Sequence, residues 1–212
     1  CTPHIYPGMY DNDRDGIRAA VASFRNELAQ RDIDLQLVEG ADVHLDLDLL
    51  SGIRDGRVPT LAGSRYLLLE PPHHVAPPRF EDSVFQLMVA GVIPVITHPE
   101  RLTWIEGQYD VFERLVKGGA WMQVTAGSVT GRFGKRPQYW AEHLVHILAT
   151  DAHHPRRRPP LLAEGRDAAS RRVGEQEANH MVFTRPQGIV DNLEPGALPG
   201  LPVQPELTKS AP

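Results

Sequence analysis

Short runs of hydrophobic residues recur along the chain, and each run stops on a polar residue. A strand that is buried on both faces of a sheet is apolar throughout, so these runs predict buried strands. Five strands are predicted in this way, at Leu35–Val38, Tyr66–Leu69, Ile93–Thr97, Trp121–Val124 and His146–Thr150.

Helical patterns of hydrophobic residues precede and separate these strands. The clearest predicted helix covers residues 13–30, and Asp13 or Asp15 can cap its first turn. The alternation of strands and helices predicts an α/β fold with a mainly parallel sheet. The apolar positions of the first helix are Ile17, Ala20, Val21, Phe24 and Leu28, and further helices are predicted at Phe80–Ala90, Asp110–Lys117, Pro137–His143 and Pro160–Arg172.

Length and composition define the domain. The chain has 212 residues, of which 41% are hydrophobic, which is enough to bury the core of one globular domain. From about Asp191 onwards the sequence is rich in Pro and Gly and has few large apolar residues. We therefore expect a folded domain over residues 1–190 and a flexible tail over residues 191–212.

Charge and composition argue against several classes of protein. The 22 Lys and Arg residues against 27 Asp and Glu give a net charge of -5, which does not suit binding to nucleic acid. The sequence shows no run of about 18 apolar residues and no signal-peptide pattern at its start. A single cysteine argues against a disulfide framework and a multi-thiolate zinc site. These features predict a cytoplasmic protein that does not insert into membranes.

Residues that can bind metal ions gather at or near the predicted strand ends. The carboxyl ends of parallel strands meet at one rim of an α/β fold, where active sites are built. Imidazole and carboxylate donors without a thiolate suit Mn, Fe or Zn, and a bridging carboxylate lets two cations act on one phosphate. The candidate metal ligands are His4, Asp42 or Glu39, Glu70, His98, Asp151 and His153.

Two arginines accompany these ligands, Arg101 shortly after His98 and Arg158 shortly after Asp151. A guanidinium can hold phosphate oxygens in a bidentate contact, so the set predicts metal-assisted phosphoester hydrolysis. An ordinary salt bridge to an arginine is the alternative for Glu70. We assign no role to the other histidines, which are His44, His73, His74, His143, His146, His154 and His180.

Three other hydrolase mechanisms lack their motifs. A thiolate phosphatase needs an arginine six residues after its cysteine, but Pro7 occupies that position after Cys1. The sequence contains neither the phosphate-binding loop G-x-x-x-x-G-K-[ST] nor the G-x-S-x-G elbow of serine hydrolases.

Several motifs in order, from residue 1 to about Ile189, resemble one known family. The chain is similar to the bacterial polymerase-and-histidinol-phosphatase (PHP) type protein tyrosine phosphatases of capsular and exopolysaccharide synthesis. The motifs are T-P-H-x-x-P-G-M-Y (Thr2–Tyr10), V-x-G-A-D (Val38–Asp42), V-P-T-L…S-R-Y-L-L-L-E (Val58–Glu70), G-V-I-P-V-I-T-H-P-E-R (Gly91–Arg101), Q-V-T-A-G-S-V-T-G-R-F-G (Gln123–Gly134) and H-I-L-A-T-D-A-H…R-P-P (His146–Pro160).

This resemblance implies a distorted (β/α)7-type PHP barrel with a cluster of divalent cations at its carboxyl rim. The usual metal is manganese, with Fe, Zn, Co or Mg as alternatives, and Glu70 is expected to bridge two cations. Arg101 and Arg158 are the implied phosphate-binding residues, and an oligomer is compatible with the family. The implied substrate is phosphotyrosine on the tail of a cognate bacterial tyrosine kinase. The implied ligands are His4, Asp42, Glu70, His98, Asp151 and His153.

The chain departs from the family in two ways. The family usually carries Glu at the position of Asp42, so we expect that metal contact to lengthen or to pass through water. The family also begins with a strand ending in D-x-H-x-H before the position of His4, and this sequence contains no H-x-H. We therefore expect that the first βα unit and at least three ligands are missing. The 212 residues alone should bind metal weakly and hydrolyse little substrate, whereas the gene product from which they come should be active.

Two other functions stay open. The same scaffold could hydrolyse a small phosphate monoester such as histidinol phosphate, and comparing its turnover with that of phosphotyrosine would separate the two. The other alternative is a catalytically inert chain that binds the kinase tail through Arg101 and Arg158. A full complement of tightly held cations would contradict that alternative.

Overall fold

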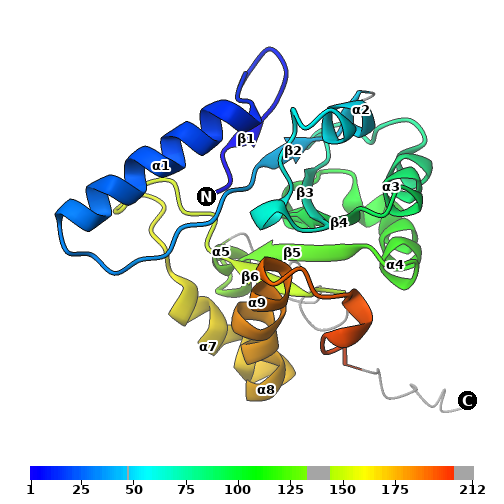
Figure 1. The fold of residues 1–212 in the computed structure, drawn as a ribbon. Helices are drawn as coiled ribbons and strands as arrows, with labels where there is room; N and C mark the ends of the chain where they lie inside the picture. Colours follow the sequence, from blue (N-terminus) through cyan, green and yellow to red (C-terminus); the bar gives the residue numbers. More distant parts are fainter. Residues whose placement is uncertain (47, 133–143, 203–212) are drawn as a thin grey trace, which may run out of the picture.

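A six-stranded sheet forms the centre of the molecule, and its strands are all parallel and lie in sequence order. The computed structural model describes residues 1–46, 48–132 and 144–202. The sheet confirms the predicted α/β class (Figure 1). The strands are β1 (His4–Ile5), β2 (Asp42–His44), β3 (Tyr66–Glu70), β4 (Ile93–Thr97), β5 (Trp121–Thr125) and β6 (Ile147–Ala149).

Helices connect the strands and cover the sheet. In Figure 1, α3 and α4 lie together beside β4 and β5, while α7, α8 and α9 lie together beside β6. The α-helices are α1 (Arg14–Gln30), α2 (Leu49–Arg54), α3 (Phe80–Val89), α4 (Tyr109–Lys117), α5 (Ala126–Val129), α7 (Leu162–Val173), α8 (Glu175–Asn179) and α9 (Arg185–Val190). Shorter helical turns are η1 (Leu61–Gly63), η2 (Pro99–Arg101), η3 (Ile105–Gln108), the π-helical η4 (His180–Thr184) and η5 (Pro195–Ala197).

The alternation of side chains along β3 separates two hydrophobic clusters. Leu67 and Leu69 join the large cluster that the helices complete. Tyr66 and Leu68 point to the opposite face, into a smaller cluster. Glu70 follows them with the same period of two, so its carboxylate lies on the second face, at the end of the strand. The smaller cluster consists of Tyr66, Leu68, Val95, Trp121, Ile147 and Ile189.

Most predicted elements are confirmed. The predicted helix over 13–30 is α1, and its cap is Asp13, whose Oδ1 accepts a hydrogen bond of 2.8 Å from Gly16 N. The predicted strand Leu35–Val38 is wrong, because this segment is not a strand and Leu35 is 56% exposed. The predicted helix Pro137–His143 lies outside the described residues.

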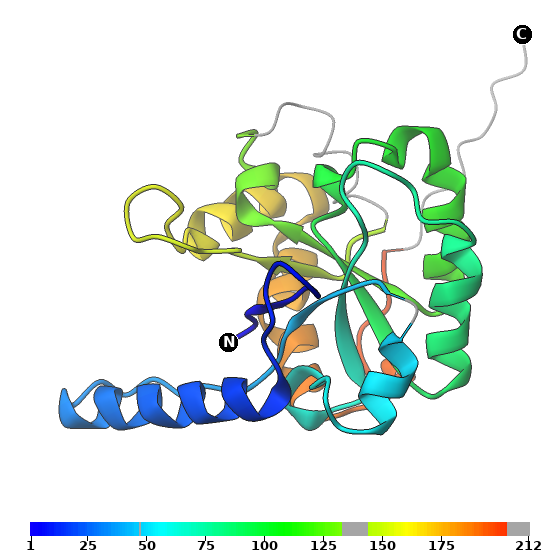
Figure 2. The ribbon, with the colours of Figure 1, turned by 90° about the horizontal axis from the view of Figure 1, so that it is seen from above.

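Helix α1 lies at the edge of the molecule and runs outwards from it (Figure 2). It buries Ile17, Val21 and Leu28, but Phe24 is 50% exposed although it has the helical spacing of a core residue. The apolar pattern therefore predicted the helix correctly and overstated how much of its surface is covered.

The first part of the expected tail contacts the folded domain. Residues as far as Gly200 pack against the domain, because the buried Arg185 donates hydrogen bonds to the carbonyl oxygens of Pro199 and Gly200. Tyr66 Oη also donates to the carbonyl oxygen of Leu193, at 2.9 Å. The carboxylate of Glu177 completes the shell around Arg185, with Nη1–Oε1 at 2.6 Å.

A membrane-spanning helix is not found among the described residues, since no helix there combines the necessary length and hydrophobicity.

The buried His146 predicts a pH dependence of stability. Its ring stacks on Trp121 at a centroid distance of 4.8 Å, and its Nδ1 accepts a hydrogen bond from Met122 N. Burial, with the nearby charge of Arg185, lowers the pKa of His146 from 6.5 to about 3. Between these values the unfolded chain binds a proton that the folded chain does not, so stability falls as the pH falls.

Replacing His146 should make the free energy of unfolding depend less on pH. His146→Gln keeps an acceptor and removes the titration. On going from pH 7.5 to pH 5.5, the free energy of unfolding of the unsubstituted protein should fall by about 1 kcal/mol more than that of the variant. Urea denaturation at both pH values measures the difference, and parallel losses in the two proteins would show that His146 titrates normally.

Candidate metal centre

Four of the predicted ligands meet near the carboxyl ends of β3 and β4, although His4 and Asp42 are the first residues of β1 and β2. His4 lies in β1, Asp42 in β2 and Glu70 at the end of β3, while His98 follows β4 directly. The strands are staggered, since Asp42 is in register with His4 on one side and with Leu68 on the other. This stagger brings side chains from successive strands to the same place.

The ligand atoms of these residues lie within a few ångströms of one another. His4 Nδ1 lies 3.0 Å from Glu70 Oε2 and 3.7 Å from Asp42 Oδ2. His98 Nε2 lies 3.3 Å from Asp42 Oδ2 and 3.5 Å from Glu70 Oε1. Asp42, Glu70 and His98 are 8%, 6% and 1% exposed, so the cluster is largely removed from water.

Neighbouring groups hold the cluster in place. The hydroxyl of the buried Thr97 donates a hydrogen bond of 3.0 Å to Asp42 Oδ1, which leaves Oδ2 directed at the histidines. His98 has a φ of 30°, which is unusual for a residue with a side chain and represents local strain. Strain of this kind persists only where the surroundings fix the conformation, and here the hydrogen bond from Arg101 N to His98 O closes the turn.

Glu100 joins the ends of two strands. Its Oε1 accepts a hydrogen bond of 2.8 Å from Thr125 N, at the junction of β5 and α5. Burial raises the pKa of Glu100. Glu100 therefore links the turn that carries His98 and Arg101 to the end of β5.

Electrostatics within the cluster favour an ionised carboxylate. Burial alone would raise the pKa of Glu70, but the contacts with His4, His73 and His98 outweigh burial and hold that pKa well below its ordinary value. The hydrogen bond with Glu70 in turn raises the pKa of His4, against the opposing effect of burial. Without a cation, these contacts therefore favour a protonated His4 beside the ionised Glu70.

Asp151 and His153 lie beside this cluster and are not part of its close contacts. Asp151 Oδ2 forms an ion pair with Arg158 Nη2 and lies 3.9 Å from Arg101 Nη1. His153 Nδ1 bonds to the carbonyl oxygen of Asp151, and its ring centroid lies 6.1 Å from that of His4. Burial, together with nearby cationic groups, lowers the pKa of His153. A cavity of about 560 Å³ is nevertheless lined by His4, Asp42, His98, Asp151 and His153.

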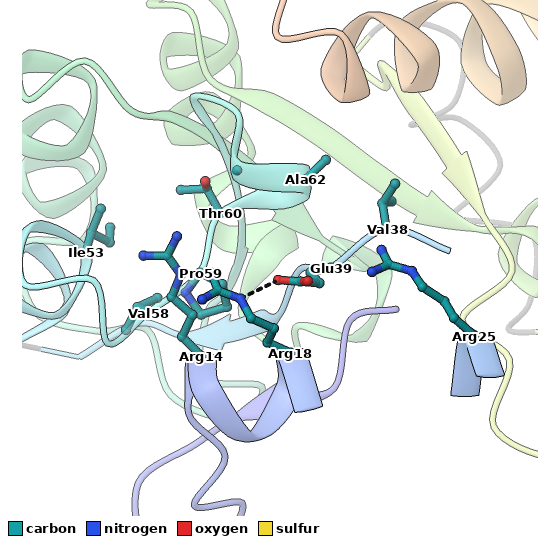
Figure 3. A pocket seen from close by; sticks show the side chains of 11 residues that line it. Arg14, Arg18, Arg25, Val38, Glu39, Ile53, Val58, Pro59, Thr60 and Ala62 are labelled. Atoms are coloured by element: carbon teal, nitrogen blue, oxygen red, sulfur yellow. Dashed lines mark ion pairs between the residues drawn. The ribbon is translucent and has the colours of Figure 1, made fainter. Parts of the chain in front are cut away.

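The sequence left open whether Glu39 or Asp42 belongs to the site, and the structure places Asp42 in the cluster. Glu39 Oε2 instead forms an ion pair of 3.5 Å with Arg18 Nε. Figure 3 shows this pair in a different cavity, of about 420 Å³, where Arg14 and Arg25 of α1 also point. No residue of the metal-ligand cluster lines that cavity.

His73 belongs to the cluster although the sequence analysis assigned it no role. Its Nε2 lies 3.1 Å from Glu70 Oε1 without the alignment of a hydrogen bond. His73 Nε2 and His98 Nδ1 are both buried atoms without a hydrogen-bond partner.

The donor set fits divalent cations. Among the described residues, two groups bring their ligand atoms within 4.8 Å of one another, namely His4 with Asp42 and Glu70, and Glu70 with His73 and His98. A buried imidazole nitrogen without a hydrogen-bond partner beside a buried carboxylate, as His73 Nε2 is beside Glu70, suits a borderline divalent ion.

Comparison with known proteins identifies the family of this chain. A family model described as "Capsular polysaccharide synthesis, CpsB/CapC" matches residues 1–191. The chain belongs to the CpsB/CapC family. This membership confirms the resemblance seen in the sequence motifs.

The relatives of this family member are tyrosine-protein phosphatases by name. The chain is 30% identical over 168 residues to the putative tyrosine-protein phosphatase CapC of Staphylococcus aureus, covering 77% of this chain and 66% of that protein. It is 26% identical over 201 residues to the tyrosine-protein phosphatase CpsB of Streptococcus agalactiae, covering 90% of this chain and 83% of that protein. The chain thus spans just under two thirds of the length of the first relative.

A solved structure confirms the PHP-type fold that the resemblance implied. The match comes from the crystal structures of YwqE from Bacillus subtilis and CpsB from Streptococcus pneumoniae, described as unique metal-dependent tyrosine phosphatases. The TM-score is 0.84 at 27% identity, and the match covers 91% of this chain and 80% of that chain.

The raised pKa of His4 predicts that cation binding depends on pH. A cation and a proton compete for the imidazole, so Mn²⁺ affinity should fall by about tenfold per pH unit once His4 is protonated. Calorimetric titration with Mn²⁺ between pH 8 and pH 5.5 measures this dependence. His4→Asn should bind Mn²⁺ less tightly with a shallower pH slope, and an unchanged slope would exclude His4 as a ligand.

Proposed function

We propose that the protein is a metal-dependent phosphotyrosine-protein phosphatase that acts on a bacterial tyrosine kinase regulating capsular and exopolysaccharide synthesis. The observation that carries this proposal is the pair of arginines beside the cluster of metal-binding side chains. Arg101 and Arg158 both approach Asp151 Oδ2, and both side chains are 35% exposed. Both arginines line a second cavity beside the cluster, of about 510 Å³, from which an anion can reach them.

The proposed ligands are the six that the resemblance implied, namely His4, Asp42, Glu70, His98, Asp151 and His153. Manganese is the proposed metal. When bound, the cations supply an activated water and polarise the phosphoryl oxygens. Residues 1–190 are the proposed phosphatase domain, to which the packed segment up to Gly200 adds contacts.

The arginines are proposed to bind the phosphate of the substrate. A phosphotyrosine phosphate carries about two negative charges at neutral pH and offers three acceptor oxygens. It can replace Asp151 as the partner of Arg101 and Arg158, which frees the carboxylate of Asp151 to bind a cation. The guanidinium groups then stabilise the charge that develops on the equatorial oxygens during transfer.

The proposed partner is the phosphotyrosine-bearing tail of a cognate kinase. The relatives that support this assignment are named as tyrosine-protein phosphatases CapC and CpsB. We further propose that the protein acts in the cytoplasm, where a single unpaired cysteine suits the reducing conditions.

The experiment that tests this function measures phosphate release by the full-length gene product with Mn²⁺. Phosphotyrosine peptide and histidinol phosphate are compared at equal concentrations. We expect faster hydrolysis of the peptide, and loss of activity after treatment with EDTA. Preference for histidinol phosphate would favour a small-molecule phosphatase, and tight Mn²⁺ binding without hydrolysis of either substrate would contradict the enzyme assignment.

Removal of one arginine should separate phosphate binding from metal binding. Arg158→Ala should lower kcat/KM for phosphotyrosine peptide by about 10²–10³-fold, as expected for loss of one donor that stabilises transition-state charge. The neighbouring Arg157 is exposed and provides the matched control Arg157→Ala. Equal losses in both variants would show that general surface charge, and not the placement of Arg158, is responsible.

A further inference from the structure

His73 contacts the centre of the metal cluster from the loop after β3. This loop begins with Pro71 and Pro72, whose rings restrict the backbone directly before His73. His73 Nε2 reaches to 3.1 Å from Glu70 Oε1, and its ring meets that of His98 edge-on, with centroids 5.3 Å apart. A buried nitrogen that is close to a carboxylate but lacks a hydrogen bond is unusual in a folded protein.

Contacts with the next loop hold His73 in this place. Thr103 N donates a hydrogen bond of 2.9 Å to the carbonyl oxygen of His73. Trp104 Nε1 donates another, of 2.8 Å, to the carbonyl oxygen of Pro72. The backbone that carries the imidazole is thus held by hydrogen bonds that need no cation, as a preorganised ligand requires.

The two oxygens of Glu70 face two different sets of donors. Oε2 lies 3.0 Å from His4 Nδ1, whereas Oε1 lies 3.1 Å from His73 Nε2 and 3.5 Å from His98 Nε2. Two ligand atoms that are each about 2.0–2.2 Å from one metal ion lie roughly 3–3.5 Å apart. The separations on the Oε1 side are therefore those of atoms sharing one ion.

We propose that His73 is a metal ligand, which binds a second cation together with Glu70 Oε1 and His98. This cation position shares Glu70 with the position at His4 and Asp42. Two imidazoles and one carboxylate favour a borderline ion such as Zn²⁺, Co²⁺, Fe²⁺ or Mn²⁺ over Mg²⁺, which prefers oxygen ligands. This inference shares one assumption with the proposed function, which is that divalent ions bind at this rim.

Binding of Co²⁺ to the full-length protein provides the test, because the visible absorption of Co²⁺ reports the number and type of its ligands. His73→Ala should lower the affinity for Co²⁺ at one position by at least about tenfold and change its absorption spectrum. His73→Gln can still donate a hydrogen bond to Glu70, so it should behave like His73→Ala if His73 is a ligand. It should behave like the unsubstituted protein if the contact with Glu70 is only structural.

The neighbouring His74 supplies the control. Its side chain is exposed, and His74→Ala should leave both the Co²⁺ affinity and the spectrum unchanged. Thermal unfolding of each variant in EDTA shows whether the apo fold is intact. Because His73 is only half-buried, its variants should unfold in EDTA within a few degrees of the unsubstituted protein.

The outcomes separate this inference from the proposed function. Unchanged Co²⁺ binding in His73→Ala would overturn the inference, while hydrolysis of phosphotyrosine peptide by the unsubstituted protein would still support the function. A His73-dependent Co²⁺ spectrum without phosphotyrosine hydrolysis would support the inference and contradict the function. Absence of any Co²⁺ binding at micromolar concentration would overturn both.

Discussion

The rim of the sheet depends on one buried carboxylate, that of Glu70. An ionised carboxylate removed from water and left unpaired costs on the order of several kcal/mol, so the fold must supply positive partners. In the described part of the chain, imidazole nitrogens of His4, His73 and His98 lie 3.0, 3.1 and 3.5 Å from its oxygens. An arginine stays protonated, whereas a histidine can lose its proton and offer a lone pair. Histidine partners can therefore share this carboxylate with a cation, which an arginine partner would exclude.

The apolar side chains of the sheet place Glu70 and its partners at the edge of the core. Tyr66 and Leu68 fill the face of β3 on which Glu70 also lies, so the carboxylate is placed at the edge of a dry cluster. The stagger between strands adds His4 and Asp42 from one side, and the strained turn at His98 adds an imidazole from the other. The apolar core thus raises the strength of the electrostatic contacts at its edge, because the local dielectric is low there.

The sequence predicted those features that follow from strand ends, and it missed those that depend on how loops turn. Glu70 and His98 come directly at the ends of apolar runs, so the rule that parallel strands meet at one rim was sufficient to find them. His73 follows two prolines, and no periodicity in the sequence indicates that this loop folds back onto Glu70. Leu35–Val38 was predicted as a strand because it is apolar, yet burial is decided by what packs on a segment. The exposure of Leu35–Val38 could therefore not be derived from the residues of this segment alone.

Histidines surround Glu70, whereas arginines neutralise Asp151 on the other side of the rim. In the proposed function, this difference couples substrate binding to metal binding. Arg101 and Arg158 hold Asp151 with charges that do not titrate, so this carboxylate is released only when another anion takes its place. A phosphate bound by the arginines therefore increases the number of carboxylate ligands available to the cations. By thermodynamic linkage, cations that bind Asp151 must strengthen phosphate binding by the same factor. In the proposed function, the ion pair between Asp151 and Arg158 is therefore the structural element that couples the two binding events.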